Sequence, residues 1–206
     1  ISNARVHFLS NVNPYLRPDG MDITAWCDQC IEEFEALVLN TGPDRLAAFI
    51  AEPVLASGGV IIPPDGYHLR CLELCRKYDI VYISDEVVTA FGRLGEFFSS
   101  KNVFGIEPDI ITVAKGITSG YVPLGGVLIS DRLMDEIKFE EKRNVIFSNG
   151  FTYSAHPVSC AAALKNIEIM ERENLFNHVK DIAPYFQKRL QDLRCHDIVG
   201  DVRGIG

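Results

Sequence analysis

The stretch PDIITVAKGITSGYVPLGG (residues 108–126) places a lysine directly after a run of mostly apolar residues. This run, residues 110–114, lacks the polar alternation of a half-exposed strand and is typical of a strand buried on both faces of a parallel sheet. Ordinary strands of this kind end in a turn residue, whereas this one ends in Lys115. Lys115 is therefore the first candidate for a functional side chain.

The rest of the chain alternates similar strands with helical patterns. Buried strands are predicted in residues 45–54, 79–87, 109–115 and 123–130, and the start of a further strand in residues 198–204. Helical periodicity predicts helices over residues 22–39, 66–78, 131–138, 155–173 and 174–195, while residues 1–20, 88–98 and 147–157 read as loops. This order predicts an α/β fold with a mostly parallel sheet covered by helices on both faces.

Composition excludes several classes of protein. The chain has 206 residues, is 47% hydrophobic and carries a net charge of −8, so we expect neither a nucleic-acid nor a membrane partner. The chain opens and closes within regular patterns, and we expect it to be part of a longer protein. We expect a cytoplasmic location, with an organelle-targeting segment upstream left open.

The six cysteines are interpreted as reduced thiols with structural roles. Cys27 and Cys30 form a CxxC pair, but they lie inside a helical pattern and not between a strand and a helix, as redox pairs do. Their spacing to Cys71 and Cys75 is long for a zinc site, and the five histidines are scattered singly. We therefore expect no metal.

Three ionisable residues end three predicted strands: Glu52, Asp85 and Lys115. Ligands of parallel α/β sheets bind beyond the carboxyl ends of the strands, so these residues form a candidate site. A partly desolvated lysine can keep its amine neutral and attack aldehydes. An aspartate beside it can hold the ring nitrogen of pyridoxal phosphate (PLP) in its protonated form. The pair therefore favours a PLP site.

Three other functional classes are weighed against this interpretation. The segment from Ile80 to Glu86 also fits the magnesium-binding strand of nucleotide hydrolases. This stretch contains no GxxxxGK[ST] phosphate loop, and a nucleotide hydrolase with that loop upstream stays open as a remote alternative. No GxGxxG motif indicates a dinucleotide site. A non-enzymatic α/β binding domain stays open, because a fold alone does not decide function.

Three segments carry a family resemblance. They are AEPVLASGGVIIPPDGYHLRCLELCRKYDIVYISDEVVTAFGRLGEFF (51–98), PDIITVAKGITSGYVPLGGVLIS (108–130) and GFTYSAHPVSCAAALKNIEIM (150–170). Together they resemble the class III PLP-dependent aminotransferases, and within them the omega-amino acid–pyruvate group. The resemblance implies fold type I with a smaller α+β C-terminal domain, amino transfer from an amine or ω-amino acid to a keto acid such as pyruvate, and a homodimer with shared active sites.

The resemblance also implies residue roles. Lys115 would hold the cofactor as a Schiff base and move the substrate proton, and Asp85 would pair with the ring nitrogen. Val87 would pack on one ring face, and Thr152 would bind the cofactor phosphate of the neighbouring subunit. Glu52 would lie on the substrate side.

Other features qualify the resemblance. Arg93 is interpreted as structural or as bridging acids near the site, and His156 as a helix-start residue. Residues 55–59 (LASGG) are closer to dialkylglycine decarboxylase, so a class III decarboxylase or racemase is the alternative. We expect residues 1–170 to belong to the large PLP-binding domain and 171–206 to start the small domain. The phosphate-binding loop and the carboxylate-binding arginine of the family are expected outside this stretch.

Overall fold

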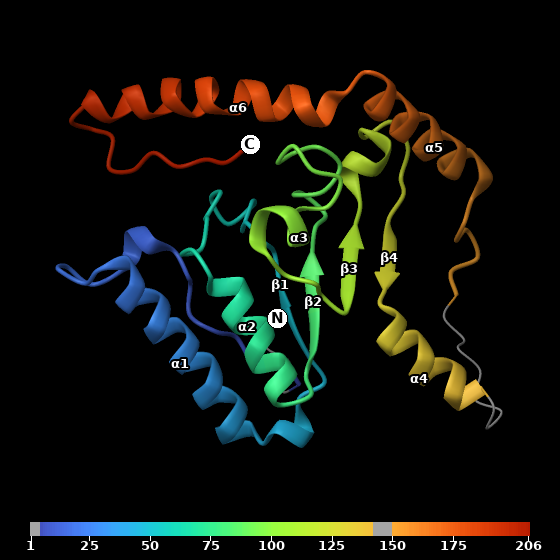
Figure 1. Ribbon diagram of the computed structural model, residues 1–206, viewed down its shortest axis with the longest axis horizontal. Helices are drawn as coiled ribbons and strands as arrows, with labels where there is room; N and C mark the ends of the chain where they lie inside the picture. The colour runs from blue at the N-terminus through green and yellow to red at the C-terminus, as the bar shows by residue number, and fades with distance from the viewer. Residues whose placement is uncertain (1–4, 142–149) are drawn as a thin grey trace.

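The computed structural model describes residues 5–141 and 150–206, which form one sheet flanked by helices (Figure 1). The strands are β1 (Ala48–Ala51), β2 (Val81–Asp85), β3 (Ile110–Val113) and β4 (Gly126–Ile129). The α-helices are α1 (Ile23–Thr41), α2 (Tyr67–Lys77), α3 (Ser99–Phe104), α4 (Asp131–Glu141), α5 (Pro157–Arg172) and α6 (Leu175–Gln191). The 3₁₀ helices are η1 (Pro14–Leu16), η2 (Pro43–Arg45), η3 (Lys115–Thr118) and η4 (Asp192–Cys195).

The four strands form a single sheet in the order β1-β2-β3-β4. The first three are parallel, with α2 and α3 in the connections, and β4 runs antiparallel to β3. The prediction of a mostly parallel sheet and of its four strands is thus confirmed. Because the parallel strands all run the same way, their carboxyl ends lie at one edge of the sheet.

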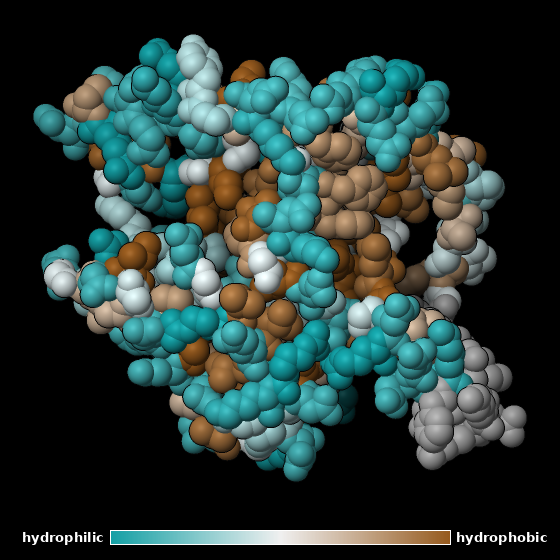
Figure 2. Space-filling view, in the orientation of Figure 1, coloured by the Kyte–Doolittle hydropathy of each residue, from teal (hydrophilic) through white to brown (hydrophobic). Residues whose placement is uncertain are grey.

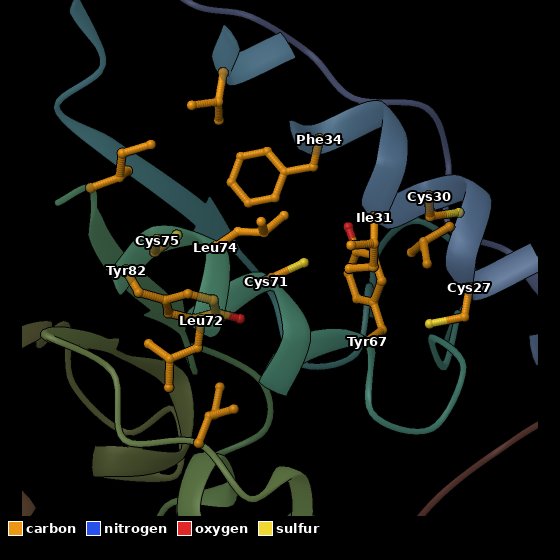
Figure 3. Packing of buried hydrophobic residues seen from close by; sticks show 14 of the residues in the cluster. Cys27, Cys30, Ile31, Phe34, Tyr67, Cys71, Leu72, Leu74, Cys75 and Tyr82 are labelled. Carbon is orange, nitrogen blue, oxygen red and sulfur yellow. The ribbon is translucent and has the colours of Figure 1, made fainter. Parts of the chain in front are cut away.

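The helices α1 and α2 cover one face of this sheet. The Asp22 carboxylate starts α1 by accepting hydrogen bonds from the amides of Thr24 and Ala25, at 2.8 and 2.9 Å. The apolar side of α1 then packs on α2, and Figure 3 shows Phe34, Tyr82 and Leu74 facing each other in this core. These contacts hold the layer formed by α1 and α2 against the sheet.

The opposite face is less covered than expected. Within the described residues, the Ile50 side chain of β1 and the Val127 side chain of β4 are each 60% exposed. In β2, the residues on this face, Val81 and Ile83, are half-buried, whereas Tyr82 and Ser84 on the α1/α2 face are fully buried. The prediction of strands buried on both faces is therefore wrong for this face, on which no described residue of the four strands is buried.

The cysteine prediction is confirmed for most of the six thiols. All six are free, and four are buried between α1 and α2: Cys27, Cys30, Cys71 and Cys75. Burial raises the pKa of the Cys30 thiol to about 11 and that of Cys75 to about 12, so these thiols are protonated and unreactive at neutral pH. Cys195 is exposed and does not fit the expectation of a buried role.

A buried carboxylate joins the amino ends of the strands to the helices. Asp109, just before β3, is 1% exposed in its side chain and accepts hydrogen bonds from Arg76, Arg132 and the Tyr82 amide. Burial alone would raise the pKa of this carboxyl, but the hydrogen bonds from Arg132, Tyr82 and Arg76 hold it below its usual value. Asp109 therefore anchors β3 at the edge opposite Lys115.

A second buried side chain, His68 of α2, links β2 to the segment that follows β1. Its Nε2 donates to the Pro53 carbonyl oxygen at 3.0 Å, which leaves Nδ1 to accept the Tyr82 hydroxyl proton at 2.9 Å. This arrangement requires a neutral ring. Burial, only partly offset by the bond to Pro53, lowers the pKa of His68 from about 6.5 to about 4.

This pKa shift predicts a loss of stability in mild acid. The unfolded chain takes up a proton as the pH falls below 6.5, whereas the folded ring does so near pH 4. The stabilisation is therefore complete above pH 6.5 and declines toward pH 4, with about 2 kcal/mol lost at pH 5. Urea unfolding at pH 7 and pH 5 measures it. In a His68→Gln variant the part of the pH dependence due to this ring should vanish, and an unchanged pH dependence would contradict the prediction.

The structure differs from the sequence analysis at one helix and one predicted strand, and two predicted irregular segments lie partly outside the described residues. Helix α3 lies just after residues 88–98 and was not predicted, because six residues are too few for a clear period. Residues 198–204 form no strand; they run as irregular chain beneath α6. Residues 1–20 were predicted to be irregular, and residues 1–4 of this range lie outside the described part of the chain. Residues 147–157 were predicted to form a loop, and residues 147–149 of it also lie outside the described part. None of the described helices is long and apolar enough to cross a membrane.

Candidate active site

The three charged residues predicted at strand ends lie at one edge of the sheet. Glu52 follows β1, Asp85 is the last residue of β2, and Lys115 comes two residues after β3. The strand register pairs Ala51 with Ser84 and Asp85 with Thr112, so the three strands end at nearly the same level. Neighbouring strands are about 4.8 Å apart, so this edge holds two carboxylates and one amine in adjacent positions.

Lys115 starts the turn η3 with an unusual backbone. Its φ is +43°, in the left-handed region that non-glycine residues rarely adopt, after an extended Ala114. The amide of Ile117 donates to the Ala114 carbonyl oxygen at 3.2 Å and closes the turn. The Lys115 side chain is exposed. The chain therefore leaves β3 abruptly and presents the amine at the strand edge, and such strain is often kept at functional positions.

Asp85 is half-buried and oriented by the chain that follows it. Its Oδ1 accepts a hydrogen bond from the Val87 amide at 3.1 Å. Among the described residues, Oδ2 has no hydrogen-bond donor, so one carboxylate oxygen is left for another partner. Val87 itself is half-buried, two residues further along. This geometry suits a carboxylate that pairs with a cationic group placed beyond the end of β2.

Glu86, which sequence reasoning passed over, anchors the backbone next to Asp85. Its side chain is fully buried and accepts hydrogen bonds from the backbone amides of Ser99 and Ser100 at 2.6 and 2.9 Å. The hydroxyls of both serines also donate to it, at 2.8 and 2.5 Å. Ser84 is hydrogen-bonded to the Ser100 hydroxyl at 2.9 Å. Both neighbours of Asp85 are thus tied to the start of α3.

Replacing Glu86 with Gln is expected to destabilise the fold by about 2–3 kcal/mol. The amide nitrogen would then face N–H and O–H donors, and at least one buried donor would lose its acceptor. Urea unfolding of the variant measures the change. The matched control is Glu107→Gln, which alters an exposed carboxylate paired with Lys101 and should cost no more than about 1 kcal/mol. Equal effects of the two substitutions would contradict the anchoring role.

Glu52 is held by the loop that follows it. Its Oε2 accepts a hydrogen bond from the Ala56 amide at 3.1 Å, and the loop closes through a β-bridge between Leu55 and Ile61. From the other end of the chain, Arg203 Nε donates to the Gly59 carbonyl oxygen at 2.8 Å. The C-terminal segment therefore supports the loop beside the candidate site, a contact that the sequence did not indicate.

The structure does not bring the remaining candidates to this edge. Thr152 lies in an exposed turn ahead of α5, and its hydroxyl bonds to no described residue. Its proposed partner belongs to a neighbouring subunit, so its role stays a prediction. Arg93 is exposed and forms no ion pair with an acid of the described residues, so its role stays a prediction. His156 is the N-cap residue of α5, as expected for a helix-start residue.

An apolar cleft of about 660 Å³ lies under α6. Its lining includes Phe91, Met170, Phe176 and Phe186, and Figure 2 shows hydrophobic side chains gathered in the middle of this face. Its walls do not include Glu52, Asp85 or Lys115. Phe91 packs against Gly116, directly after Lys115, and so joins the cleft to the turn η3. No group of metal-ligating side chains occurs in the described ranges.

Chemically, the strand edge offers one amine that can attack a carbonyl and one carboxylate that can hold a cation. Comparison with known protein families agrees with such chemistry. Residues 4–206 match the model of the family described as aminotransferase class-III.

Among curated proteins, the chain is 44% identical over 199 residues to a putrescine–pyruvate aminotransferase of Pseudomonas aeruginosa. This match covers 94% of this chain and 42% of that protein. It is 45% identical over 172 residues to the mitochondrial gamma-aminobutyrate transaminase 1 of Oryza sativa subsp. indica, covering 84% of this chain and 33% of that protein. The chain thus spans less than half the length of these relatives.

Solved structures show the same likeness. A transaminase from a directed-evolution study by ancestral reconstruction superposes with a TM-score of 0.96 at 43% identity, over 100% of this chain and 45% of the other. A thermostable (S)-enantioselective omega-transaminase from Thermomicrobium roseum gives a TM-score of 0.90 at 41% identity, over 96% of this chain and 43% of that one. The fold of the described residues is therefore that of a transaminase.

Proposed function

Because this chain belongs to the class-III aminotransferases, we propose that the whole protein moves an amino group from an amine or ω-amino acid to a keto acid such as pyruvate, with PLP as its cofactor. The described residues have the PLP-dependent transferase fold type I, with a mostly parallel sheet flanked by helices. The observation that carries the proposal is the position of Lys115 and Asp85 at the ends of two adjacent parallel strands.

The donor groups at this edge fit PLP. Lys115 supplies an exposed amine for the cofactor aldehyde, and Asp85 has an unengaged oxygen for the protonated ring nitrogen. Val87 would lie against one ring face, and Thr152 would bind the phosphate held mainly by a neighbouring subunit. Glu52 would lie on the substrate side. When bound, PLP supplies the electron sink that stabilises negative charge at the substrate Cα.

In this proposal Lys115, Asp85 and Glu86 each have a separate role. Lys115 holds the cofactor and then carries the proton between the substrate Cα and the cofactor. Asp85 stays ionised beside the ring nitrogen and keeps it protonated. The Glu86 anchor holds the backbone of Asp85 in place through Ser99 and Ser100, so the carboxylate stays beside the ring nitrogen.

The substrates that we propose are those in the names of the similar proteins. The names of two relatives specify putrescine with pyruvate and gamma-aminobutyrate, all of them compounds with a terminal amine or a small keto acid. We propose donors of this class for the present protein, and pyruvate as acceptor. A screen of the whole protein tests it by following alanine formation from pyruvate with diamines and ω-amino acids as donors, and pyruvate formation from alanine with a different keto acid as acceptor. Absence of amino transfer from every donor of this class would contradict the proposal.

A class III decarboxylase or racemase is the second candidate, favoured by the loop 55–59, which differs from that of most aminotransferases. The same screen separates them if carbon dioxide is followed together with alanine. Carbon dioxide released in step with turnover would favour the decarboxylase, and loss of optical activity without amino transfer would favour the racemase.

We further propose a homodimer with shared active sites, since Thr152 finds no partner within the described chain. The break between α5 and α6, at Glu173 and Asn174, lies close to the proposed domain boundary between residues 170 and 171. A cytoplasmic location is proposed as well, with a mitochondrial one as the alternative because the rice relatives are named as mitochondrial.

A further inference from the structure

A side chain from α5 holds the turn that carries Lys115. Asn166 Nδ2 donates hydrogen bonds to the carbonyl oxygens of Gly116 and Ile117, at 2.9 and 3.1 Å. Its Oδ1 accepts the hydroxyl proton of Ser119 at 2.7 Å. Asn166 is half-buried, and Figure 1 shows α5 beside the turn after β3. One asparagine, about fifty residues further along the chain, thus binds three residues of this turn.

The turn requires such support. Lys115 and Ser119, at its two ends, both have a left-handed backbone, with φ of +43° and +49°. Non-glycine residues keep this conformation where the surrounding structure enforces it. On the other side of the turn, a Cβ at Gly116 would lie 2.9 Å from the Phe91 Cβ, so no space is left there. The turn is therefore clamped between Phe91 and Asn166.

We propose that Asn166 is a positioning residue for Lys115: by holding the carbonyls of Gly116 and Ile117, it fixes the direction in which the lysine amine leaves the sheet. The inference rests on the proposed function, because the amine is aimed at the cofactor aldehyde. Asn166 touches neither cofactor nor substrate in this role. It acts through the backbone on which the amine is mounted.

A simpler role for Asn166 is stabilisation of the fold. The two roles differ in what they change. Loss of stability lowers the amount of folded protein, whereas misdirection of the amine lowers kcat of the folded protein and changes the pH at which the lysine–cofactor pair titrates. A longer side chain that keeps the amide should restore part of the function under the positioning role.

The test uses Asn166→Leu, which keeps the shape but removes all three bonds, and Asn166→Gln, which keeps the amide. In the whole protein with PLP, Asn166→Leu should lower kcat by about 10- to 100-fold with little change in KM. The pH at which the cofactor absorbance changes should move by about one unit. Asn166→Gln should lie between the Leu variant and wild type.

The matched control is Asn177→Asp, at an exposed asparagine of α6 that bonds to Asn174 and does not contact the turn. It should match wild type in kcat, KM and absorbance. Asn166→Asp retains the acceptor for Ser119 but lacks the two donors, so it should resemble Asn166→Leu. If Asn166→Leu does not fold, Asn166→Asp and Ser119→Ala carry the same test.

Hydrogen–deuterium exchange of residues 115–119 in the cofactor-free protein gives a readout that needs no catalysis. Exchange at this turn should be at least about tenfold faster in Asn166→Leu than in wild type. Unchanged kcat, absorbance and exchange in a folded Asn166→Leu variant would overturn the inference and leave the proposed function intact. A wild-type protein that neither binds PLP nor transfers an amino group would overturn the proposed function, and the positioning role with it.

Discussion

Replacing Lys115 with Ala is expected to lower kcat by at least about 10⁴-fold, which corresponds to about 5 kcal/mol on the barrier. The substitution removes the amine at the end of β3, which under the proposed function both holds PLP covalently and moves the substrate proton. The fold should persist, because the Lys115 side chain is exposed and contributes little buried area. Activity should therefore fall much more than stability.

Borohydride reduction of the protein with PLP, followed by peptide mapping, locates the covalent attachment. Wild type should carry the cofactor on the peptide that contains Lys115, and Lys115→Ala should carry none there. A small amine added to the variant should recover part of the proton transfer. The matched control is Lys101→Ala, at an exposed lysine paired with Glu107, which should keep full activity. Covalent cofactor on the same peptide of Lys115→Ala would disprove the assignment.

Replacing Asp85 with Asn is expected to lower kcat by at least about 100-fold, or about 2.7 kcal/mol. The amide keeps the shape and can still accept the Val87 hydrogen bond through its oxygen. Under the proposed function, the substitution removes the anion beside the ring nitrogen, which should then lose its proton, so that the electron sink weakens. The Glu86 anchor lies on neighbouring backbone and stays intact, so the loss reflects charge and not position.

Steady-state kinetics and the absorbance of bound PLP measure this effect. The control Asp44→Asn removes an exposed carboxylate of η2 and should leave both unchanged. A rate within threefold of wild type, about 0.7 kcal/mol on the barrier, would show that Asp85 is not the partner of the ring nitrogen. The effect should be smaller than that of Lys115→Ala, because the ring nitrogen tunes the chemistry whereas the lysine takes part in it.

The candidate edge could be predicted from the sequence because its residues follow a local rule. Apolar runs end in Glu52, Asp85 and Lys115, and parallel strands bring their carboxyl ends to one edge of a sheet. The same rule makes no prediction for residues inside loops. It gave no indication of α3, and it led to a wrong strand prediction at residues 198–204, which run as irregular chain beneath α6 and pair with no described strand.

The residues that hold the candidate site in place could not be predicted. Glu86 meets Ser99 and Ser100 across thirteen and fourteen residues, and Asn166 meets Gly116 across fifty. Each of these side chains has ordinary local surroundings in the sequence: Glu86 resembles a second strand-end acid, and Asn166 resembles a polar residue on an exposed side of a helix. Their partners are brought to them by the packing of α3 and α5.

The sequence by itself determined the four strands, the five longer α-helices and the charged residues at the strand ends, because these depend on apolar periodicity and on residues adjacent in the chain. Tertiary structure alone decided how those charges are held: the left-handed backbone of Lys115 between Phe91 and Asn166, and the buried anchor of Glu86 beside Asp85. Hydrogen bonds between distant segments form only after the sheet and its helices have packed, so no local pattern encodes them.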